Sequence, residues 1–252
     1  MGNVATTAAS FDVYEHIRNY NRLVGTDISF AFQTIMDAAN FEVVGFEALV
    51  RGIKKEPASQ VISRISHDDR FDFDQACRIR AIEAAAEFEI DGNLHLNATD
   101  IKAANVELVV EVTRHLANRH KIDTGRIVLE LNNLNAQGGA DSLAQVSATL
   151  HEAGFRTLVD NFGQRDADLR PLTEFRPHLV KLDHRLVEGI HEKQDAQAIA
   201  LGLIRFCQTM EIEPVASGVE TADEFRWLQD AGIRLFQGYF FAQPEMNSSS
   251  DD

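Results

Sequence analysis

The sequence is poor in cysteine and contains no long apolar run. Its two cysteines, Cys77 and Cys207, are too few for a disulfide framework or a thiolate metal site, and they suit a reducing compartment. No apolar run reaches the roughly 18 residues that a membrane-spanning helix needs. The opening residues, MGNVATTAAS, have neither a basic region nor an apolar core, so no signal peptide is expected. We therefore expect a cytoplasmic protein without a membrane partner.

Positive charge is also scarce. The chain has 24 Lys and Arg residues against 39 Asp and Glu residues, which gives a formal net charge of −15. A protein that binds the phosphate backbone of a nucleic acid needs a basic surface, so the composition argues against a nucleic-acid partner. A small anionic nucleotide stays compatible if local positive groups or a metal ion offset its charge. The nine histidines form no HExxH motif and no close ligand pair, so we assign them no metal.

The chain alternates short apolar stretches with helical patterns. Roughly eight strands in about 220 residues fit a (β/α)8 barrel of the TIM type. A doubly wound sheet is the alternative, but no Gly-rich phosphate-binding turn follows the first strand. The strands are predicted at residues 30–36, 41–50, 93–97, 126–131, 155–159, 178–182, 213–216 and 233–236. The main helices are predicted at residues 71–90, 101–120, 140–153, 196–210 and from the capping box at Thr221 to Gly232.

The same pattern predicts the domain organisation. We expect a disordered start and an N-terminal helix within residues 1–29, a barrel domain over residues 30–246 and a disordered tail over residues 247–252. The N-terminal helix is predicted from an apolar face within residues 11–24.

Polar residues stand at or near the ends of the predicted strands. Because the strand ends of a barrel converge on one face, we expect these side chains to meet there. Three carboxylates and an amide would form an oxygen-ligand site that suits Mg²⁺, Mn²⁺ or Ca²⁺ rather than zinc. The alternative is that they are separate surface residues. The four candidate metal ligands are Glu47, Asn97, Glu130 and Asp160, and the other polar strand ends are Lys181, Asp183, Ser217 and Gln237.

Taken in order, these motifs resemble the bacterial EAL domain, the cyclic di-GMP phosphodiesterase family. The resemblance runs from about residue 30 to Pro244. The stretch DQACR at residues 74–78, with residues 47–52, is most similar to EAL domains that follow blue-light BLUF sensors. The matching motifs are Gln33, FEALVR (46–51), Asn97, EL (130–131), DNFG (160–163), KLD (181–183), GVE (218–220), QGY (237–239) and Pro244.

The resemblance implies a barrel with one atypical antiparallel strand and two-metal hydrolysis of cyclic di-GMP to the linear dinucleotide. It assigns the first metal to Glu47, Asn97, Glu130 and Asp160, and a catalytic role to Lys181. The implied cofactor is Mg²⁺ or Mn²⁺, with the first site retained and the second weakened. The implied ligand-binding residues are Gln33, Glu47, Leu49, Arg51, Asn97, Asp183, Glu220, Gln237 and Pro244.

Three positions depart from the family pattern. Asn133 replaces the second glutamate of the ELTE motif, Asn161 the second aspartate of DDFGTG, and Ser217 the first glutamate of EGVE. The resemblance implies that these positions respectively anchor a loop, bind the second metal and assist the attacking water. Two-metal hydrolysis needs enough negative charge to hold two dications close together. A serine is also no general base near neutral pH without help.

These departures predict a degenerate, catalytically inactive EAL domain. It would act in cyclic di-GMP signalling by binding the ligand, a regulatory protein, or both. A weakly active metal-dependent cyclic di-GMP phosphodiesterase is the alternative, and a barrel enzyme for another phosphodiester is a third. A homodimer is a further expectation, although the loop at residues 163–170, GQRDADLR, is more charged than the family's. A charged loop of this kind is usually a solvated one; the alternative is an altered contact surface, which would leave the chain a monomer or pair it with another protein.

Overall fold

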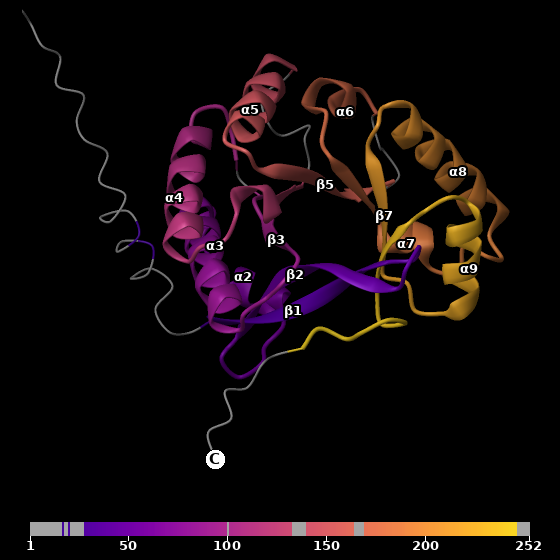
Figure 1. The fold of residues 1–252 in the computed structure, drawn as a ribbon, viewed down its shortest axis with the longest axis horizontal. Helices are drawn as coiled ribbons and strands as arrows, with labels where there is room; N and C mark the ends of the chain where they lie inside the picture. The colour runs from indigo at the N-terminus through magenta and orange to yellow at the C-terminus, as the bar shows by residue number, and fades with distance from the viewer. Residues whose placement is uncertain are drawn as a thin grey trace, which may run out of the picture.

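The computed structural model describes residues 28–99, 101–132, 140–163 and 169–245, together with Ile17 and Tyr20. The strands in these ranges close into one barrel in chain order, from β1 to β8 (Figure 1). The predicted barrel is confirmed, and closure excludes the doubly wound sheet. The strands are β1 (Ile28–Asp37), β2 (Glu42–Gly52), β3 (Asn93–Asn97), β4 (Ile127–Leu131), β5 (Arg156–Phe162), β6 (Leu179–Leu182), β7 (Glu213–Ser217) and β8 (Leu235–Gln237).

Strand β1 runs against both of its neighbours. It pairs antiparallel with β2 and with β8, whereas every pairing from β2 round to β8 is parallel. The tight turn from Asp37 to Glu42 reverses the chain and includes Phe41 at a positive φ of 57°. The antiparallel strand that the family resemblance implied is therefore confirmed.

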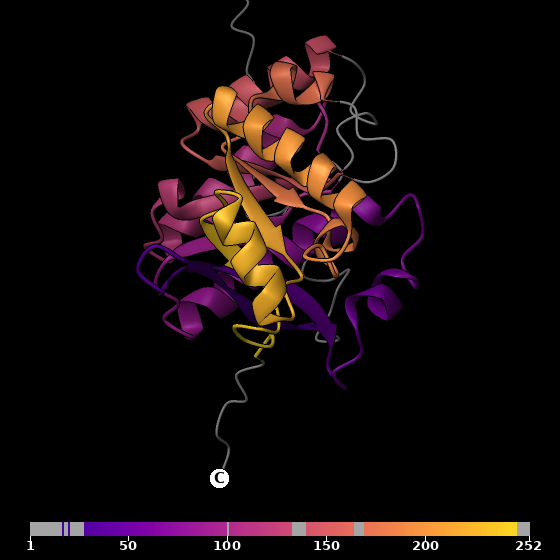
Figure 2. The same cartoon turned by 90° about the vertical axis from the view of Figure 1, so that its right-hand side faces the viewer.

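The helices surround this barrel. In Figure 1 they run in an arc from α3 and α4 through α5 and α6 to α8 and α9, and β1 and β2 lie along the side that this arc leaves; Figure 2 shows α8 and α9 together over one side of the strands. In the described part of the chain, none is both long enough and apolar enough to cross a bilayer. The helices are α2 (Ala58–Ile62), α3 (Arg70–Glu87), α4 (Val106–Arg119), α5 (Ala140–Glu152), α6 (Arg170–Phe175), α7 (His184–Val187), α8 (Gln194–Thr209) and α9 (Ala222–Asp230), with a 3₁₀ turn, η1 (Thr124–Arg126).

Two elements show how local sequence sets the boundaries. The predicted capping box is confirmed at α9, where Thr221 Oγ1 accepts from the Glu224 N–H and Glu224 Oε2 accepts from the Thr221 N–H. The helix predicted from Ile101 begins only at Val106, because the residues before it form a turn in which Asn105 Oδ1 accepts from the Lys102 N–H at 2.7 Å.

Two regions of the predicted domain scheme fall largely outside the described residues. Of the predicted N-terminal helix, the structure describes Ile17 and Tyr20, which are helical and buried. Residues 247–252 lie outside the described ranges. The domain boundaries stay predictions.

The core has two parts, one on each side of the barrel wall. A large apolar cluster lies between the strands and the helices. A small one fills the interior of the barrel. Alternate residues of a strand face inward. The residue two positions after each cluster member of a parallel strand therefore also faces inward and lies nearer the carboxyl end of that strand. The interior cluster consists of Ile35, Val128, Leu158, Leu179, Val215 and Leu235.

Candidate active site

A polar layer lies on top of the interior apolar cluster, toward the carboxyl ends of the parallel strands. It follows from register, since paired residues of neighbouring strands point to the same face. Gln33 pairs with Glu47, Glu47 with His95, Asn97 with Glu130, and Ser217 with Gln237. Positions far apart in the sequence are thus brought to one end of the barrel, as predicted.

Lys181 is the buried cation of this layer. Its Nζ donates to Glu47 Oε2 at 2.9 Å and to the two carboxylate oxygens of Glu130 at 2.9 and 2.8 Å. Burial alone would lower the pKa of Lys181, but the charges of Glu130, Glu47 and Asp160 outweigh it and raise that pKa. The side chain is therefore an ammonium that two carboxylates share.

His95 completes the surroundings of Glu130. Its Nδ1 lies 2.8 Å from Glu130 Oε1, and both side chains are buried. Burial opposes ionisation of Glu130, but the charge of Lys181 and the hydrogen bond to His95 outweigh it and lower the pKa. We did not predict a site role for His95. The alternation in NLHLN places it on the same face as Asn97, and that signal was available in the sequence.

Gln237 joins the network from β8. Its Nε2 donates to Glu47 Oε2 at 2.6 Å and to Gln33 Oε1 at 3.3 Å. Its Oε1 is buried and has no hydrogen-bond partner among the described residues. A buried amide oxygen without a partner is costly, so this atom is placed to accept from a bound molecule or a water.

The end of β5 is irregular at the site. The register with β6 shifts by one residue between Val159 and Phe162, which is a β-bulge at Asp160 and Asn161. Asn161 has a φ of 55°, and its backbone N–H donates to Asp160 Oδ1 at 2.7 Å. Burial raises the pKa of Asp160 to about 6, because Lys181 lowers it less than burial and the charges of Glu130 and Glu47 raise it. The bulge extends the strand past the predicted end at Val159.

The side chain of Asn161 acts as a hydrogen-bond donor here. Its Nδ2 donates to Asp160 Oδ2 at 2.9 Å and to Asn132 Oδ1 at 3.1 Å. An ionised aspartate at this position could donate to neither oxygen. The replacement thus links the ends of β4 and β5 through a neutral amide pair, in which Asn132 was not predicted. Asn133 lies outside the described residues, as do residues 164–168 of the charged loop.

The remaining predicted ligand residues lie around this layer. Leu49 and Arg51 alternate with Glu47 along β2 toward its carboxyl end, and Arg51 Nη1 donates to the Val50 carbonyl at 2.9 Å. Asp183 is buried and caps α7 by accepting from the Arg185 N–H at 2.8 Å.

Two predicted ligand residues lie outside this hydrogen-bonded network. Glu220 is exposed, and its N–H donates to Glu224 Oε2 at 2.9 Å. Pro244 immediately precedes Glu245, which forms a bridge with Phe32 of β1.

Comparison with known proteins identifies the fold family. The family model of the EAL domain matches residues 19–244. This chain belongs to the EAL domain family. The predicted resemblance is confirmed, including its similarity to BLUF-associated members: the blue light- and temperature-regulated antirepressor BluF of Escherichia coli K12 is 27% identical over 219 residues. That match covers 86% of this chain and 54% of BluF, so the chain spans about half of that relative.

Solved EAL structures have the same architecture. A standalone versatile EAL protein from Vibrio cholerae O395, in a cyclic di-GMP-bound form, is 34% identical with a TM-score of 0.82, and the match covers 88% of this chain and 94% of that one. BlrP1 of Klebsiella pneumoniae, solved as a calcium and cyclic di-GMP complex, is 30% identical with a TM-score of 0.80. That match covers 89% of this chain and 57% of BlrP1. BlrP1 has also been solved with manganese and cyclic di-GMP.

The charged side chains of the polar layer have the chemistry of a site for a hard cation. Glu47, Glu130 and Asp160 supply three carboxylates and Lys181 one ammonium, which leaves two negative charges when all are ionised. That excess balances one dication rather than two. In the described residues, however, no three His, Cys, Asp or Glu side chains already converge as metal ligands. Two of the carboxylates are instead paired with Lys181. Judged by their oxygen donors and by the excess of two negative charges, the residues fit one divalent ion.

Proposed function

We propose that this EAL domain binds cyclic di-GMP together with one divalent cation, Mg²⁺ or Mn²⁺, and acts as a regulator without appreciable hydrolysis. The observation that carries the proposal is the contrast at β5. Asp160 retains its carboxylate, whereas Asn161 presents a neutral amide that already donates to Asp160 and Asn132. The first cation keeps its carboxylates and the second has lost one.

Several groups support ligand binding. Arg51 stands on β2 two positions beyond Leu49, where its guanidinium is suited to a phosphate oxygen. Gln33 and Gln237 offer amide groups for the polar edges of a base, and the free Oε1 of Gln237 accepts one N–H.

A cation would be held by Glu47, Asn97, Glu130 and Asp160. When bound, it would offset the negative charge of the phosphates in this acidic chain. Lys181 donates to Glu47 and to Glu130 and fixes both carboxylates in position.

A weakly active phosphodiesterase is the second candidate. It is favoured by the intact Lys181 network and by relatives such as PdeB of Escherichia coli K12, named a probable cyclic di-GMP phosphodiesterase, which is 23% identical over 248 residues. Ser217 and Asn161 argue against efficient turnover, because each replaces a carboxylate that the family uses.

Calorimetric titration with cyclic di-GMP, with and without Mg²⁺ or Mn²⁺, tests binding. We expect binding that is strengthened by the cation and weakened by Arg51→Ala. Chromatography of the same mixtures tests turnover, with Glu47→Gln as the inactive control. Absence of binding at high ligand concentration would refute the first proposal. Production of linear dinucleotide by the wild type but not by Glu47→Gln would establish the second candidate, a weakly active phosphodiesterase.

A regulatory protein partner, a homodimer and a cytoplasmic location belong to the same proposal. Light scattering of the purified chain, with and without cyclic di-GMP, measures whether it pairs with itself.

A further inference from the structure

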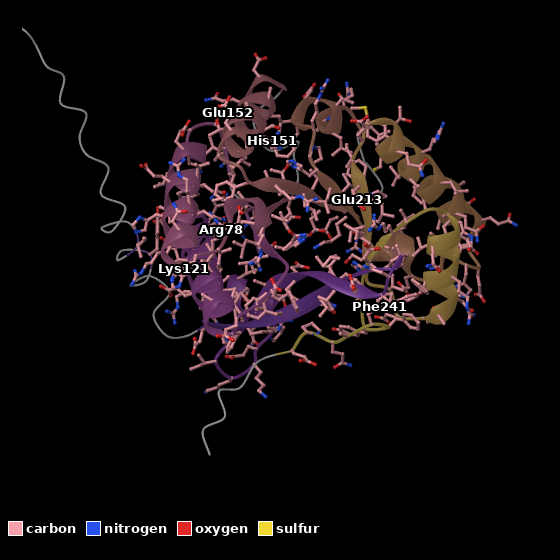
Figure 3. The ribbon with its side chains drawn as sticks, viewed as in Figure 1. Arg78, Lys121, His151, Glu152, Glu213 and Phe241 are labelled. Carbon is pink, nitrogen blue, oxygen red and sulfur yellow. The ribbon has the colours of Figure 1, made fainter. Side chains whose placement is uncertain are left out.

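A buried charged cluster on α3 lies behind the carboxyl end of β3. Arg78 and Asp74, one helical turn apart, form an ion pair, and Arg78 Nη2 donates to Gln75 Oε1 at 2.6 Å. Arg78 is only 2% exposed and Gln75 is 0% exposed. Figure 3 labels Arg78, which lies between α3 and the strands of the barrel. These are residues of the DQACR stretch that the site itself does not use.

The cluster holds the chain directly after β3. Arg78 Nη1 donates to the Asn97 carbonyl at 3.0 Å. Asp74 Oδ1 accepts from Thr99 Oγ1 at 3.2 Å and from the Thr99 N–H at 3.4 Å. Between them, the Ala98 N–H donates to the Glu130 carbonyl at 2.8 Å. Three successive residues are thus fixed, two by α3 and one by β4.

Stability alone does not account for this arrangement. A buried ion pair is often no better for stability than apolar side chains of similar volume. This one also leaves Arg78 Nε and Gln75 Nε2 buried without a hydrogen-bond partner among the described residues, which is costly. What the cluster does provide is a fixed position for Asn97, whose side chain belongs to the polar layer.

We propose that Asp74 and Arg78 are positioning residues that hold Asn97 in one orientation and thereby set the affinity of the site for a divalent cation. The affinity part rests on the proposed function, whereas the orientation part does not. Both follow from the contacts of the Asn97 carbonyl and of Thr99 with α3, which add to the pairing of Asn97 with Glu130 at the end of β3.

The test compares the wild type with Asp74→Leu/Arg78→Met, which replaces the ion pair by apolar side chains and so limits the loss of stability. Thr99→Val removes one hydroxyl contact at an exposed position and serves if the double variant does not fold. Arg78→Lys keeps the charge and a donor for the Asn97 carbonyl. Arg80→Met is the matched control, because Arg80 pairs with Glu83 on the outer part of the same helix at 2.9 Å.

Two readouts are measured on each folded chain. The first is the side-chain amide signal of Asn97 by NMR with ¹⁵N-asparagine labelling, assigned with Asn97→Asp. The second is Mn²⁺ affinity by calorimetry. We expect one sharp Asn97 signal in the wild type, Arg78→Lys and Arg80→Met. In the double variant we expect a broadened or split signal and at least tenfold weaker Mn²⁺ binding, with a smaller change of the same kind in Thr99→Val.

An unchanged Asn97 signal in the double variant, or in Thr99→Val if the double variant does not fold, would overturn the proposal. So would a changed signal with unchanged Mn²⁺ affinity. If the wild type itself binds no Mn²⁺, the metal part of the proposed function and the affinity part of this inference fail together. The Asn97 signal then decides the orientation part by itself.

Discussion

The two halves of the site differ in burial and in charge. On the side of β2, β4 and β6, Lys181, Glu47 and Glu130 form a charged network that is almost wholly buried. At the end of β5, Asn161 and Asn132 form a neutral pair in more open surroundings. The first half is part of the core, so its loss destabilises the fold. The second can change its chemistry with little effect on folding, and it contains Asn161, one of the three departures from the family pattern.

The largest expected effect comes from breaking the buried half. Lys181→Met leaves two carboxylates buried without their cation, so we expect the free energy of unfolding to fall by about 3–5 kcal/mol. Urea denaturation measures the loss. Lys193→Met is the control, because Lys193 is exposed and donates to the Glu188 carbonyl. A loss no larger than that of the control would contradict the comparison.

The next effect comes from restoring the other half. We expect Asn133→Glu/Asn161→Asp/Ser217→Glu to hydrolyse cyclic di-GMP at least about 10²-fold faster than the wild type. Each single variant should gain little, because the groups act as a unit. Asn161→Asp alone also loses the donor to Asn132.

Release of the linear dinucleotide is the measurement for this repair, and adding Glu47→Gln to the triple variant is the control. A folded triple variant that binds ligand and metal yet stays inert would show that the inactivation has another cause, and the altered loop at residues 164–170 would be the first suspect.

A smaller effect, on how stability depends on pH, is expected at the start of β5, at the opposite end of the strand from Asn161. At its start, the Thr157 N–H donates to His178 Nδ1 at 3.1 Å, and the His151 and His178 rings lie 4.6 Å apart. Burial lowers the pKa of both histidines, and the His151 and Arg156 charges lower that of His178 further. The unfolded chain therefore binds protons more readily. The histidines thus leave the free energy of unfolding undiminished above about pH 6.5. Below that pH it falls by at most about 1.4 kcal/mol per pH unit for each extra proton that the unfolded chain binds.

Denaturation curves at pH 7, 6 and 5 measure this slope. His178→Asn keeps an acceptor for the Thr157 N–H and should flatten it, whereas His67→Asn, at an exposed position, should not. Equal slopes in the wild type and His178→Asn would remove His178 from the explanation.

The smallest expected effect concerns the amide pair. Asn132→Ala removes one hydrogen bond in open surroundings, so the free energy of unfolding should fall by no more than about 1 kcal/mol. A double-mutant cycle with Asn161→Ala isolates the pair. If the coupling energy between Asn132 and Asn161 were as large as the loss of unfolding free energy in Lys181→Met, the two halves of the site would contribute equally to stability.

The sequence predicted the parts of the molecule that depend on local pattern. Period-two alternation gave β3 its observed bounds, and the capping box located α9. The expectation of one antiparallel strand came only from the family resemblance, since alternation is the same in either direction, and the structure identifies that strand as β1. Asn132 was missed because its role depends on which strands are neighbours, whereas the alternation of NLHLN already placed His95 on the face of Asn97. The hydrogen bond from Arg78 to the Asn97 carbonyl was missed for the same reason as Asn132, since no local pattern shows which strand a helix will cover.

The reversed β1 also changes how the chain enters the barrel. Ile28 pairs with Gly52, so the first residue of β1 lies at the same end of the barrel as the candidate active site rather than at the opposite end. Four residues further along, Phe32 holds Glu245 through two backbone hydrogen bonds. A pull on the backbone at Ile28 would therefore load its pairing with Gly52, at the carboxyl end of β2, before the rest of β1. The amino end of β1 and the carboxyl end of β2 are thus fastened to each other at the mouth of this barrel.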